Sequence, residues 1–363
     1  MGLPTDGVRR YGGRVSNTMI AGRLDLDSLS FAVEEVPIPE PAADEVLVRV
    51  AAAGVCLSDL HLIDGTLRLP GGGGKVTLGH EVSGTVVALG SGVSQGAVEG
   101  QRVTLQAGQT CGSCASCQRR RPPCLDVRTR GVNYDGGWAE YALARVDTLV
   151  PIPDDLPFDQ AAIIPDAVST PYGAIVATAQ VRPAQSVGVW GVGGLGVHGV
   201  QVLRFCGAAP IIAIDPLPGA RERALRFGAD LALDPTAEDF AEQVRAATQG
   251  RGLDYAFDFA GVSAVREQAA KVLGLGGALV LVGLTDAPLS VADGTRFSAR
   301  RQRMLGHYGS LPQHVEELIA LAGHHRLDFS GSISGHVKLA DAADAVQQLA
   351  DKVGDPIRLV LVP

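Results

Sequence analysis

The sequence predicts an α/β protein in which a doubly wound parallel sheet is joined to an irregular β-rich domain. The first observation is length, because 363 residues exceed what one ordinary hydrophobic core organises. The second is that residues 30–150 contain short β-branched runs bounded by Gly and Pro, with little helical periodicity. The third is that short apolar strands alternate with amphipathic helices after Asp166, a pattern typical of parallel sheets.

The β-rich part contains three strand candidates, at residues 46–50, 84–89 and 102–105. Each candidate is rich in β-branched or aliphatic residues, which favour pleated, half-buried surfaces. Because no long helical pattern interrupts these candidates, we expect an irregular antiparallel barrel or sandwich.

The second part shows the alternation of a doubly wound sheet. Its predicted strands lie at residues 186–190, 210–215, 230–233, 255–258 and 278–283, and its predicted helices at 195–205, 221–227, 240–247 and between the last two strands. A tail follows, with a helix at 315–322, a strand near Val337, a helix at 340–349 and a strand at 357–361. The pattern leaves open whether this tail extends the parallel sheet or returns to the β-rich part.

Composition excludes several classes of protein. With 46% hydrophobic and 19% charged residues, the chain is not a disordered one. A net charge of −8 and only 5% aromatic residues argue against a nucleic-acid partner, and the basic run at residues 119–121 is interpreted as a solvated loop. There is no apolar run of about 18 residues that would predict a membrane span.

The N-terminal residues 1–17 contain Arg9 and Arg10 but no apolar segment after them, so we predict no secretory signal and a cytoplasmic location. We expect this segment to be a mobile extension before the first strand. The glycine-rich run at 69–74 is expected to be a flexible lip of the cleft or a permissive loop.

Four of the six cysteines crowd into one short segment, which in a cytosolic enzyme indicates metal binding before disulfides. Two residues separate each of the first three, and the segment's spacing is that of a zinc site. Four thiolates satisfy a tetrahedral zinc ion and leave no open position, so this zinc is predicted to be structural. The ligands are Cys111, Cys114, Cys117 and Cys124.

A G-x-G-x-x-G pattern lies between a predicted strand and a predicted helix, where it forms a tight turn and lets the backbone approach a pyrophosphate. The helix N-terminus then presents free N–H groups to the phosphates. The predicted contacts are Gly191, Gly193, Gly194, Leu195 and Gly196.

Asp215 closes the next strand, where a carboxylate binds the adenosine ribose hydroxyls and repels a 2′-phosphate. This favours NAD as the cofactor. Arg221 and Arg223 leave NADP as the smaller alternative, although we interpret both as solvated helix residues.

A further set of metal-ligating and hydroxyl residues has no local zinc spacing. It consists of Gly54-Val-Cys56-Leu-Ser58-Asp59-Leu-His61 and Gly79-His80-Glu81. Together with the four-cysteine segment, the glycine loop and Asp215, these residues resemble the zinc-containing medium-chain dehydrogenase/reductase family, alcohol dehydrogenase group. The resemblance extends from about residue 19 to 363.

The resemblance implies a two-domain organisation. Residues 1–167 and 306–363 would form a GroES-like catalytic domain with a structural zinc lobe near 108–126, and residues 168–305 would form a Rossmann domain that binds the dinucleotide. It also implies a homodimer or homotetramer that acts on a small alcohol or carbonyl compound and has no nucleic-acid or membrane partner.

The resemblance also implies a catalytic zinc held by Cys56, His80 and Asp166, with Asp166 where many relatives have a second cysteine. Glu81 is expected to approach the zinc when water or product exchanges on the metal. Asp59 would orient His80, and Arg358 would pair with Asp59. The alternatives without a catalytic role are that Asp166 caps a helix and that Asp59 and Arg358 form a purely structural ion pair.

The implied reaction is hydride transfer between NAD and a primary or secondary alcohol, or its aldehyde or ketone, with zinc lowering the pKa of the bound alcohol. Ser58 would contact the reacting oxygen and His61 would pass the proton onward, because histidine titrates near neutral pH. Thr170, Val282, Gly283 and Leu284 would contact the nicotinamide. For His61 the competing interpretation is a surface residue, and for Ser58 a local backbone hydrogen bond.

Other functions stay open at this point. A polyol-type zinc dehydrogenase or a carbonyl reductase of a specialised pathway uses the same scaffold. Reductases of conjugated double bonds usually lack the zinc residues, and a nucleotide-binding protein without turnover would not need them. The remaining candidates are predicted to be structural: Trp138, His198, His307 and His336, with Cys206 a small buried apolar residue.

Overall fold

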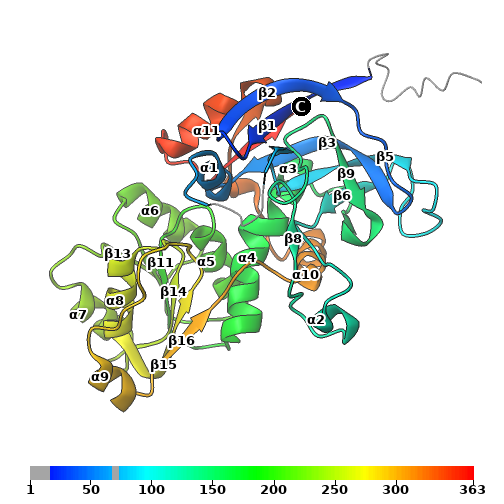
Figure 1. Cartoon of the computed structure of the whole chain (residues 1–363). Coiled ribbons are helices and arrows are strands. Elements are labelled where there is room, and N and C mark those ends of the chain that lie inside the picture. Colours follow the sequence, from blue (N-terminus) through cyan, green and yellow to red (C-terminus); the bar gives the residue numbers. More distant parts are fainter. Residues whose placement is uncertain (1–16, 68–72) are drawn as a thin grey trace, which may run out of the picture.

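The computed structural model describes residues 17–67 and 73–363. The predictions for residues 1–16 and for most of the glycine-rich run at 69–74 therefore lie outside the described part of the chain. Figure 1 shows two bodies, a helix-covered sheet and a β-rich body, with α4 (Ser169–Gly173) between them.

The helix-covered body is a six-stranded parallel sheet with the order β13-β12-β11-β14-β15-β16. This confirms the doubly wound sheet. Its strands are β11 (Val187–Trp190), β12 (Ile211–Ile214), β13 (Leu231–Leu233), β14 (Leu253–Asp258), β15 (Leu273–Leu281) and β16 (Arg303–Gly306). Its helices are α5 (Gly196–Phe205), α6 (Pro218–Arg226), α7 (Phe240–Ala247), α8 (Ser263–Val272) and α9 (Gly294–Ala299).

The β-rich body contains a seven-stranded sheet in which β10, β6, β5, β3, β18 and β17 are neighbours in that order and β9 also pairs with β3. A three-stranded sheet, β2-β1-β4, lies beside it. The strands are β1 (Thr18–Asp25), β2 (Ser30–Pro37), β3 (Glu45–Val55), β4 (Lys75–Thr77), β5 (Val82–Leu89), β6 (Arg102–Leu105), β9 (Tyr141–Arg145), β10 (Leu149–Pro151), β17 (Ile333–Lys338) and β18 (Arg358–Val362).

Short elements complete this body. They are α1 (Leu57–Ile63), β7 (Gly108–Gln109), α2 (Ala115–Gln118), β8 (Arg128–Thr129), α11 (Ala342–Ala350) and the 3-10 turns η1 (Val146–Thr148), η4 (Ser330–Ser332) and η5 (Leu339–Asp341). Helix α10 (Pro312–Gly323) contacts α4 instead. The antiparallel β-rich domain predicted from the sequence is confirmed, although most of its shorter strands were not predicted, namely β1, β2, β4, β7, β8, β9 and β10. In the parallel sheet, β16 was not predicted.

The C-terminal tail returns to the β-rich body, which resolves the alternative left open by the sequence. Strand β18 pairs antiparallel with β3, with Val360 opposite Gly54. Strand β17 pairs parallel with β18, and α11 contacts β18, β17 and β3. The last strand of the chain is therefore next to the strand that leads to Cys56.

A nearly continuous helical segment connects the two bodies. It runs from α3 (Phe158–Ile163) through the π-helix η2 (Ile164–Val168) and α4 to a second π-helix, η3 (Ala174–Ala179). Most of it is buried in the larger hydrophobic core, which also contains residues of β11, β12 and α10. Such wide turns often lie at functional sites, and Asp166 is within the first of them.

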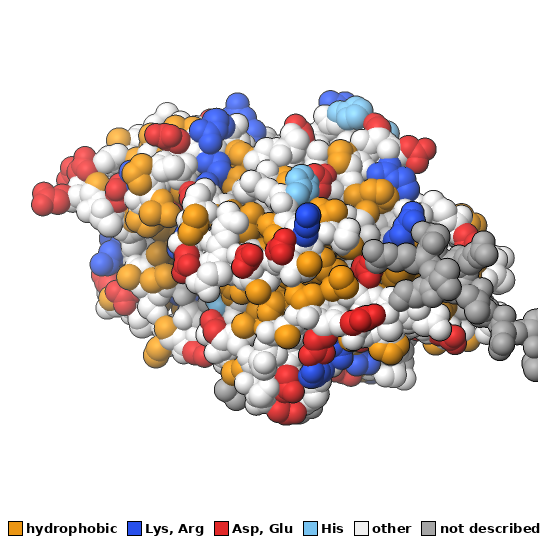
Figure 2. Space-filling model, turned by 90° about the horizontal axis from the view of Figure 1, so that it is seen from above, with side chains coloured by type: hydrophobic (Ala, Val, Ile, Leu, Met, Phe, Trp, Pro, Cys, Tyr) orange, Lys and Arg blue, Asp and Glu red, His pale blue; other side chains and the backbone are white. Residues whose placement is uncertain are grey.

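The charged side chains on the surface are distributed as the acidic net charge of the chain predicts. On the face seen in Figure 2, Lys and Arg side chains alternate with Asp and Glu and form no continuous basic surface. Within the described residues, no helix is long and apolar enough to cross a membrane.

Candidate functional site

The four-cysteine segment folds into a small lobe around α2. The Cys111 Sγ lies 4.0 Å from the Cys117 Sγ and 3.6 Å from the Cys124 Sγ, and the Cys114 and Cys124 sulfurs are 3.9 Å apart. A tetrahedron of sulfurs about 2.3 Å from zinc has edges of about 3.8 Å. The spacing of the sulfurs therefore fits a closed zinc site.

Backbone amides in the lobe point at these sulfurs. Hydrogen bonds from the backbone N–H groups of Cys117 and Leu125 lower the pKa of the Cys114 thiol to about 6. Helix α2 has no buried residue, so apolar packing contributes little to the lobe. A bound metal is what would hold the loop in this shape.

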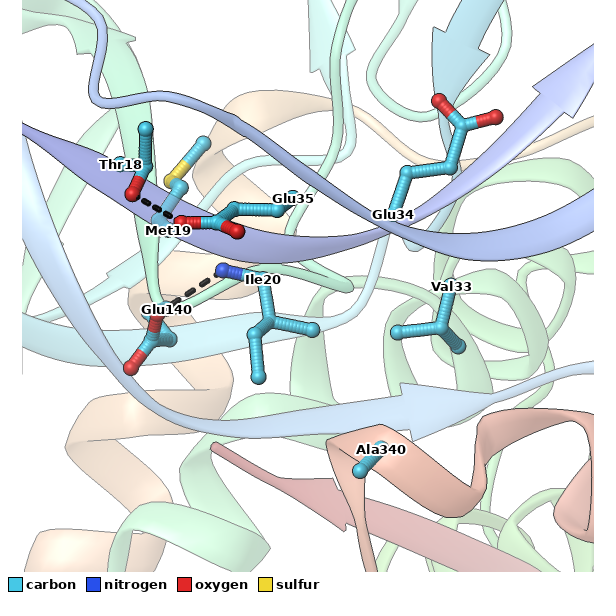
Figure 3. Close-up of a pocket in the computed structure, with 8 residues that line it drawn as sticks. All are labelled: Thr18, Met19, Ile20, Val33, Glu34, Glu35, Glu140 and Ala340. Carbon is cyan, nitrogen blue, oxygen red and sulfur yellow. Dashed lines mark hydrogen bonds between the residues drawn. The ribbon is translucent and has the colours of Figure 1, made fainter.

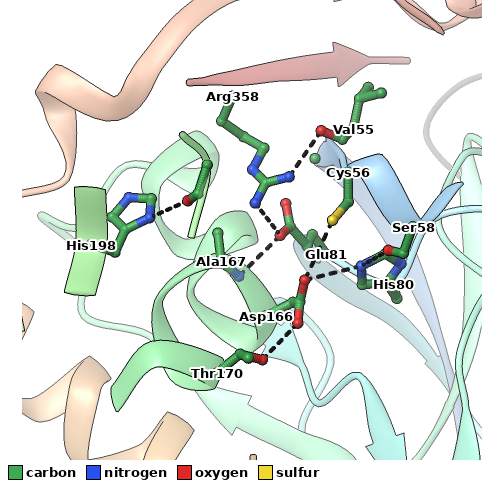
Figure 4. A network of polar contacts seen from close by, with 12 residues as sticks. Val55, Cys56, Ser58, His80, Glu81, Asp166, Ala167, Thr170, His198 and Arg358 are labelled. Carbon is green, nitrogen blue, oxygen red and sulfur yellow. Dashed lines mark hydrogen bonds and ion pairs between the residues drawn. The ribbon is translucent and has the colours of Figure 1, made fainter. Parts of the chain in front are cut away.

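A second group of metal-binding side chains comes together from three distant segments (Figure 4). The Asp166 Oδ2 lies 3.5 Å from the Cys56 Sγ and 3.3 Å from the His80 Nε2. The edges of a tetrahedral zinc site are about 3.5 Å between sulfur and oxygen and about 3.3 Å between nitrogen and oxygen. Both distances therefore fit Asp166 as a zinc ligand together with Cys56 and His80, in a cluster that also contains Glu81.

Local structure explains the position of each side chain. Cys56 follows β3 directly and is the N-cap residue of α1. His80 is buried between β4 and β5, and Asp166 projects from the π-helix η2. Because Asp166 belongs to this internal turn, its interpretation as a simple helix N-cap is wrong.

Asp59 supports two of these residues at once. Its Oδ2 accepts a hydrogen bond from the Cys56 backbone N–H at 2.9 Å, and its Oδ1 lies 3.4 Å from the His80 Nδ1. Burial lowers the pKa of His80, but the carboxylates of Asp59 and Asp166 outweigh burial and raise it well above its usual value. The pocket thus favours positive charge beside His80, which a divalent cation would supply.

Arg358 does not pair with Asp59, so that prediction is wrong. Its Nη2 lies 3.3 Å from the Glu81 Oε1, and its Nη1 donates to the Val55 carbonyl at 3.0 Å. Both members of the pair are buried. Burial raises the pKa of Glu81 to about 7, although Arg358 opposes this effect.

Glu81 is fixed in place beside Cys56, His80 and Asp166. Its Oε1 also accepts a hydrogen bond from the Ala167 N–H at 3.0 Å, whereas its Oε2 has no hydrogen-bond partner among the described residues. A side chain at Gly54 would collide with that oxygen, because a Cβ there would lie 1.9 Å from it. The carboxylate therefore has one oxygen free in a metal-binding cluster that also contains Cys56, His80 and Asp166.

Ser58 lies at the same pocket, with its Oγ 3.5 Å from the His80 Nε2. His61 is one turn further along α1 and is partly buried. Thr170 lies one turn after Asp166 and donates its hydroxyl to the Asp166 Oδ1 at 2.8 Å. The sequence did not predict this last contact.

The glycine loop connects β11 to α5, as expected for a dinucleotide site. Gly191 has a φ of 81°, which favours glycine, and a Cβ at Gly196 would lie 1.8 Å from the Gly191 carbonyl oxygen. Leu195 is the N-cap residue of α5, and Gly194 packs against Ile357. The loop therefore directs a helix N-terminus toward the β-rich body.

Asp215 directly follows β12, and its carboxylate braces this loop. Its Oδ2 accepts from the Val192 N–H at 3.0 Å and its Oδ1 from the Leu217 N–H at 2.9 Å. Arg221 donates to the carbonyl of Asp215 and pairs with Asp234.

The interpretation of Arg223 as a solvated residue is wrong. Its guanidinium is buried and pairs with the Asp355 carboxylate at 2.8 Å, and it also donates to the Val192 carbonyl. Arg223 thus ties the glycine loop to the segment before β18, and it is committed to contacts within the protein.

Val282, Gly283 and Leu284 follow β15 and line an open cavity of about 410 Å³ together with His307 and Tyr308. Val282 is buried, whereas Leu284 is 52% exposed. A second cavity of about 440 Å³ lies between β1, β2 and Ala340 (Figure 3). It shares no lining residue with the cluster of Cys56, His80, Glu81 and Asp166.

One buried ion pair at the cofactor side was missed from the sequence. The Arg266 Nε donates to the Asp258 Oδ2 at 2.8 Å, and the Asp258 Oδ1 accepts from the Gly261 N–H. Arg266 also donates to the Gly283 carbonyl. The signal in the sequence was an acidic residue at the end of an apolar strand, followed by a glycine.

The remaining candidates have structural surroundings. Trp138 is fully buried, and its ring N–H donates to the Gly54 carbonyl. His198 contacts the Gly194 carbonyl and the Ser332 hydroxyl, and His336 pairs with Asp159. Cys206 is only half-buried, so its prediction as a buried residue was too strong.

Comparison with known proteins gives two family matches. Residues 42–154 match the alcohol dehydrogenase GroES-like domain, and residues 194–323 match the zinc-binding dehydrogenase domain. The first domain contains the four-cysteine lobe with Cys56 and His80, and the second begins within the glycine loop.

Individual relatives agree with these matches. The chain is 34% identical to sorbitol dehydrogenase of Bacillus subtilis, over 71% of this chain and 74% of that protein. It is 31% identical to L-threonine 3-dehydrogenase of Pyrococcus abyssi, over 76% and 79% of the two chains. A zinc-binding dehydrogenase from Sinorhizobium meliloti, solved with NADP bound, superposes with a TM-score of 0.87 at 28% identity, over 96% of this chain and 100% of that one. The chain belongs to the NAD(P)-dependent, zinc-containing alcohol and polyol dehydrogenase family.

Proposed function

We propose that this protein is an NAD-linked zinc alcohol dehydrogenase that interconverts a primary or secondary alcohol with its aldehyde or ketone. The observation that carries the proposal is the position of the Asp166 Oδ2, whose distances to the Cys56 Sγ and the His80 Nε2 match two edges of a zinc tetrahedron. An open fourth corner distinguishes a catalytic zinc site from the closed four-thiolate lobe.

The protein residues at this site have complementary tasks. A thiolate, a neutral imidazole and a carboxylate from Cys56, His80 and Asp166 would together balance the charge of Zn²⁺. When bound, the metal supplies Lewis acidity toward an alcohol or carbonyl oxygen, and nicotinamide supplies the hydride chemistry. The Asp59 carboxylate lies 3.4 Å from the His80 Nδ1, a position from which it would orient the ring with its Nε2 toward the metal.

Ser58 and His61 form the proposed path for the substrate proton. The Ser58 hydroxyl lies 3.5 Å from the His80 Nε2, within reach of an oxygen that a metal held by His80 would bind. From there a proton would pass toward His61, which lies on the same helix.

We expect His61→Gln to lower kcat at acidic pH more than at alkaline pH, because a proton acceptor matters most when the alcohol must still be deprotonated. The measurement is the pH dependence of kcat for alcohol oxidation. The matched control is His325→Gln, which makes the same change at an exposed position after α10. An unchanged profile in His61→Gln would remove His61 from the proton path.

NAD is favoured over NADP by the surroundings of Asp215. Its carboxylate at the end of β12 would repel a 2′-phosphate, and Arg223 is already paired with Asp355. Arg221 is likewise engaged with Asp234. The S. meliloti neighbour was solved with NADP, so both cofactors must be compared directly.

A polyol is the second candidate substrate. The relative named for sorbitol supports it, because sorbitol is a polyol, whereas the hydroxyl of L-threonine is a single secondary alcohol and supports the first candidate. Two further expectations remain predictions. One is the division into a catalytic domain of residues 1–167 and 306–363 and a dinucleotide-binding domain of residues 168–305. The other is assembly into a homodimer or homotetramer.

The test is an activity panel on the zinc-loaded protein, with NAD⁺ and NADP⁺ and with primary alcohols, secondary alcohols and polyols. We expect turnover with NAD⁺ at least about tenfold more efficient than with NADP⁺, and a narrower gap in Asp215→Ala. Turnover that survives complete removal of zinc would contradict the zinc-dependent mechanism. Preference of the wild type for NADP⁺ would contradict the assignment of NAD as the cofactor.

A further inference from the structure

The two oxygens of the Asp166 carboxylate have different surroundings. Oδ2 faces the Cys56 sulfur and the His80 Nε2, as described above. Oδ1 accepts a hydrogen bond of 2.8 Å from the Thr170 hydroxyl (Figure 4). Only one of the two oxygens is therefore directed at the metal-binding atoms.

Helical geometry brings the two residues together. Residues four apart lie on the same face of a helix, and Thr170 follows Asp166 by four positions across the junction of η2 and α4. Threonine is β-branched, so its χ1 angle has few alternatives and its hydroxyl stays directed at the carboxylate.

Thr170 is itself held by a second hydrogen bond. Its backbone carbonyl accepts from the His307 Nε2 at 3.0 Å, and the His307 Nδ1 lies 2.9 Å from the Thr178 hydroxyl. Because a carbonyl only accepts, the His307 Nε2 carries the proton and Nδ1 accepts from Thr178. Two partners thus fix the ring that supports the turn containing Thr170.

We propose that the Thr170 hydroxyl fixes Asp166 as a one-oxygen metal ligand and thereby sets how tightly zinc is held at Cys56, His80 and Asp166. Without this hydroxyl, the carboxylate is free to rotate or to present both oxygens. Thr170 is then a positioning residue, and this role differs from the nicotinamide contact that the resemblance implied. The inference rests on the proposed function, since it presupposes zinc at this site.

The test compares zinc release to a coloured chelator from the full-length wild type and from Thr170→Val, Thr170→Ser and Thr248→Val. Valine keeps the shape of threonine without its hydroxyl, and serine keeps the hydroxyl. Thr248 is a buried threonine on the nucleotide side whose hydroxyl bonds only backbone groups, so it controls for loss of a buried hydroxyl. Cobalt-substituted samples would identify the site that loses metal, because a four-thiolate site and a mixed-ligand site absorb differently.

We expect Thr170→Val to weaken zinc binding at the open site by about 10–100-fold, the usual effect of removing a partner of a metal ligand. Thr170→Ser should restore most of the affinity, and Thr248→Val should match the wild type. The four-thiolate zinc is an internal reference that none of these changes should affect.

Two outcomes would overturn the proposal: Thr170→Val that holds zinc as tightly as the wild type, or Thr170→Ser that loses it as readily as Thr170→Val. A wild-type protein that binds metal only in the four-cysteine lobe would instead contradict the proposed function. The two failures are therefore distinguishable.

Discussion

Replacing Asp166 by alanine is expected to lower kcat/KM for alcohol oxidation about a thousandfold and to reduce the zinc content from two ions to one per chain. The side chain supplies one of three metal-binding atoms and the second negative charge of the site. Without it, Cys56 and His80 remain with Glu81, whose carboxylate is already engaged by Arg358 and the Ala167 N–H, so the metal would be held weakly. A thousandfold fall in kcat/KM corresponds to about 4 kcal/mol less stabilisation of the transition state.

The matched control is Asp159→Ala, which removes an acid on α3 that pairs with the partly exposed His336. We expect this control to retain both zinc ions and nearly full activity. Asp166→Cys should recover zinc binding, because a thiolate restores the charge. If Asp166→Ala kept both ions and its activity, Asp166 would not be a ligand.

Replacing Arg358 by methionine is expected to destabilise the folded protein by about 3–5 kcal/mol, because the buried Glu81 loses its partner. The Val55 carbonyl also loses a donor. The measurement is the shift in the thermal or denaturant midpoint, taken without a metal ion between Cys56, His80 and Asp166, so that no cation beside Glu81 contributes to its ionisation.

This destabilisation should depend on pH. Arg358 lowers the pKa of Glu81, whereas burial raises it to about 7, so removing Arg358 raises it further. A pKa that is higher in the folded than in the unfolded protein makes stability fall as pH rises. The deficit of Arg358→Met relative to the wild type should therefore be larger at about pH 9 than at about pH 6.

Two further variants distinguish the loss of the partner of Glu81 from the mere loss of a buried arginine. Arg223→Met removes another buried guanidinium, but its partner Asp355 is partly exposed and can be solvated, so the loss should be smaller. Adding Glu81→Gln to Arg358→Met should recover part of the stability. Equal midpoints for Arg358→Met and the wild type would show that the pair is dispensable.

The spacing of residues along the chain was enough to predict the four-cysteine lobe and the glycine loop after β11. The four cysteines lie within one short segment, and the glycine loop is bounded by a strand and a helix whose own patterns are clear. Such signals need no knowledge of distant contacts, since the chemistry lies within a few turns of chain.

The open metal site has no such local signal. Cys56, His80 and Asp166 come from different elements, and only their resemblance to a family suggested that they meet. The pairing of Arg358 shows the limit of this reasoning. Asp59 and Glu81 are both buried acids near the site, and the register of β18 on β3 decides which one the guanidinium meets.

Other features depend on contacts that sequence periodicity does not encode. Arg223 lies on an amphipathic helix, yet the loop at Asp355 covers it. Strand β16 has only four residues, and β2 is largely half-exposed, so neither shows a strong strand pattern. The Thr170 hydroxyl could be placed on Asp166 only once the helical junction between η2 and α4 was known.

A zinc ion at an open site, distinct from the closed lobe, is the feature on which the proposed chemistry depends. Crystals of the metal-replete protein, measured on both sides of the zinc absorption edge, test it most directly. We predict two anomalous peaks, one among the four lobe sulfurs and one among the Cys56 Sγ, His80 Nε2 and Asp166 Oδ2. A single peak in the lobe, with none between Cys56, His80 and Asp166, would contradict the open site.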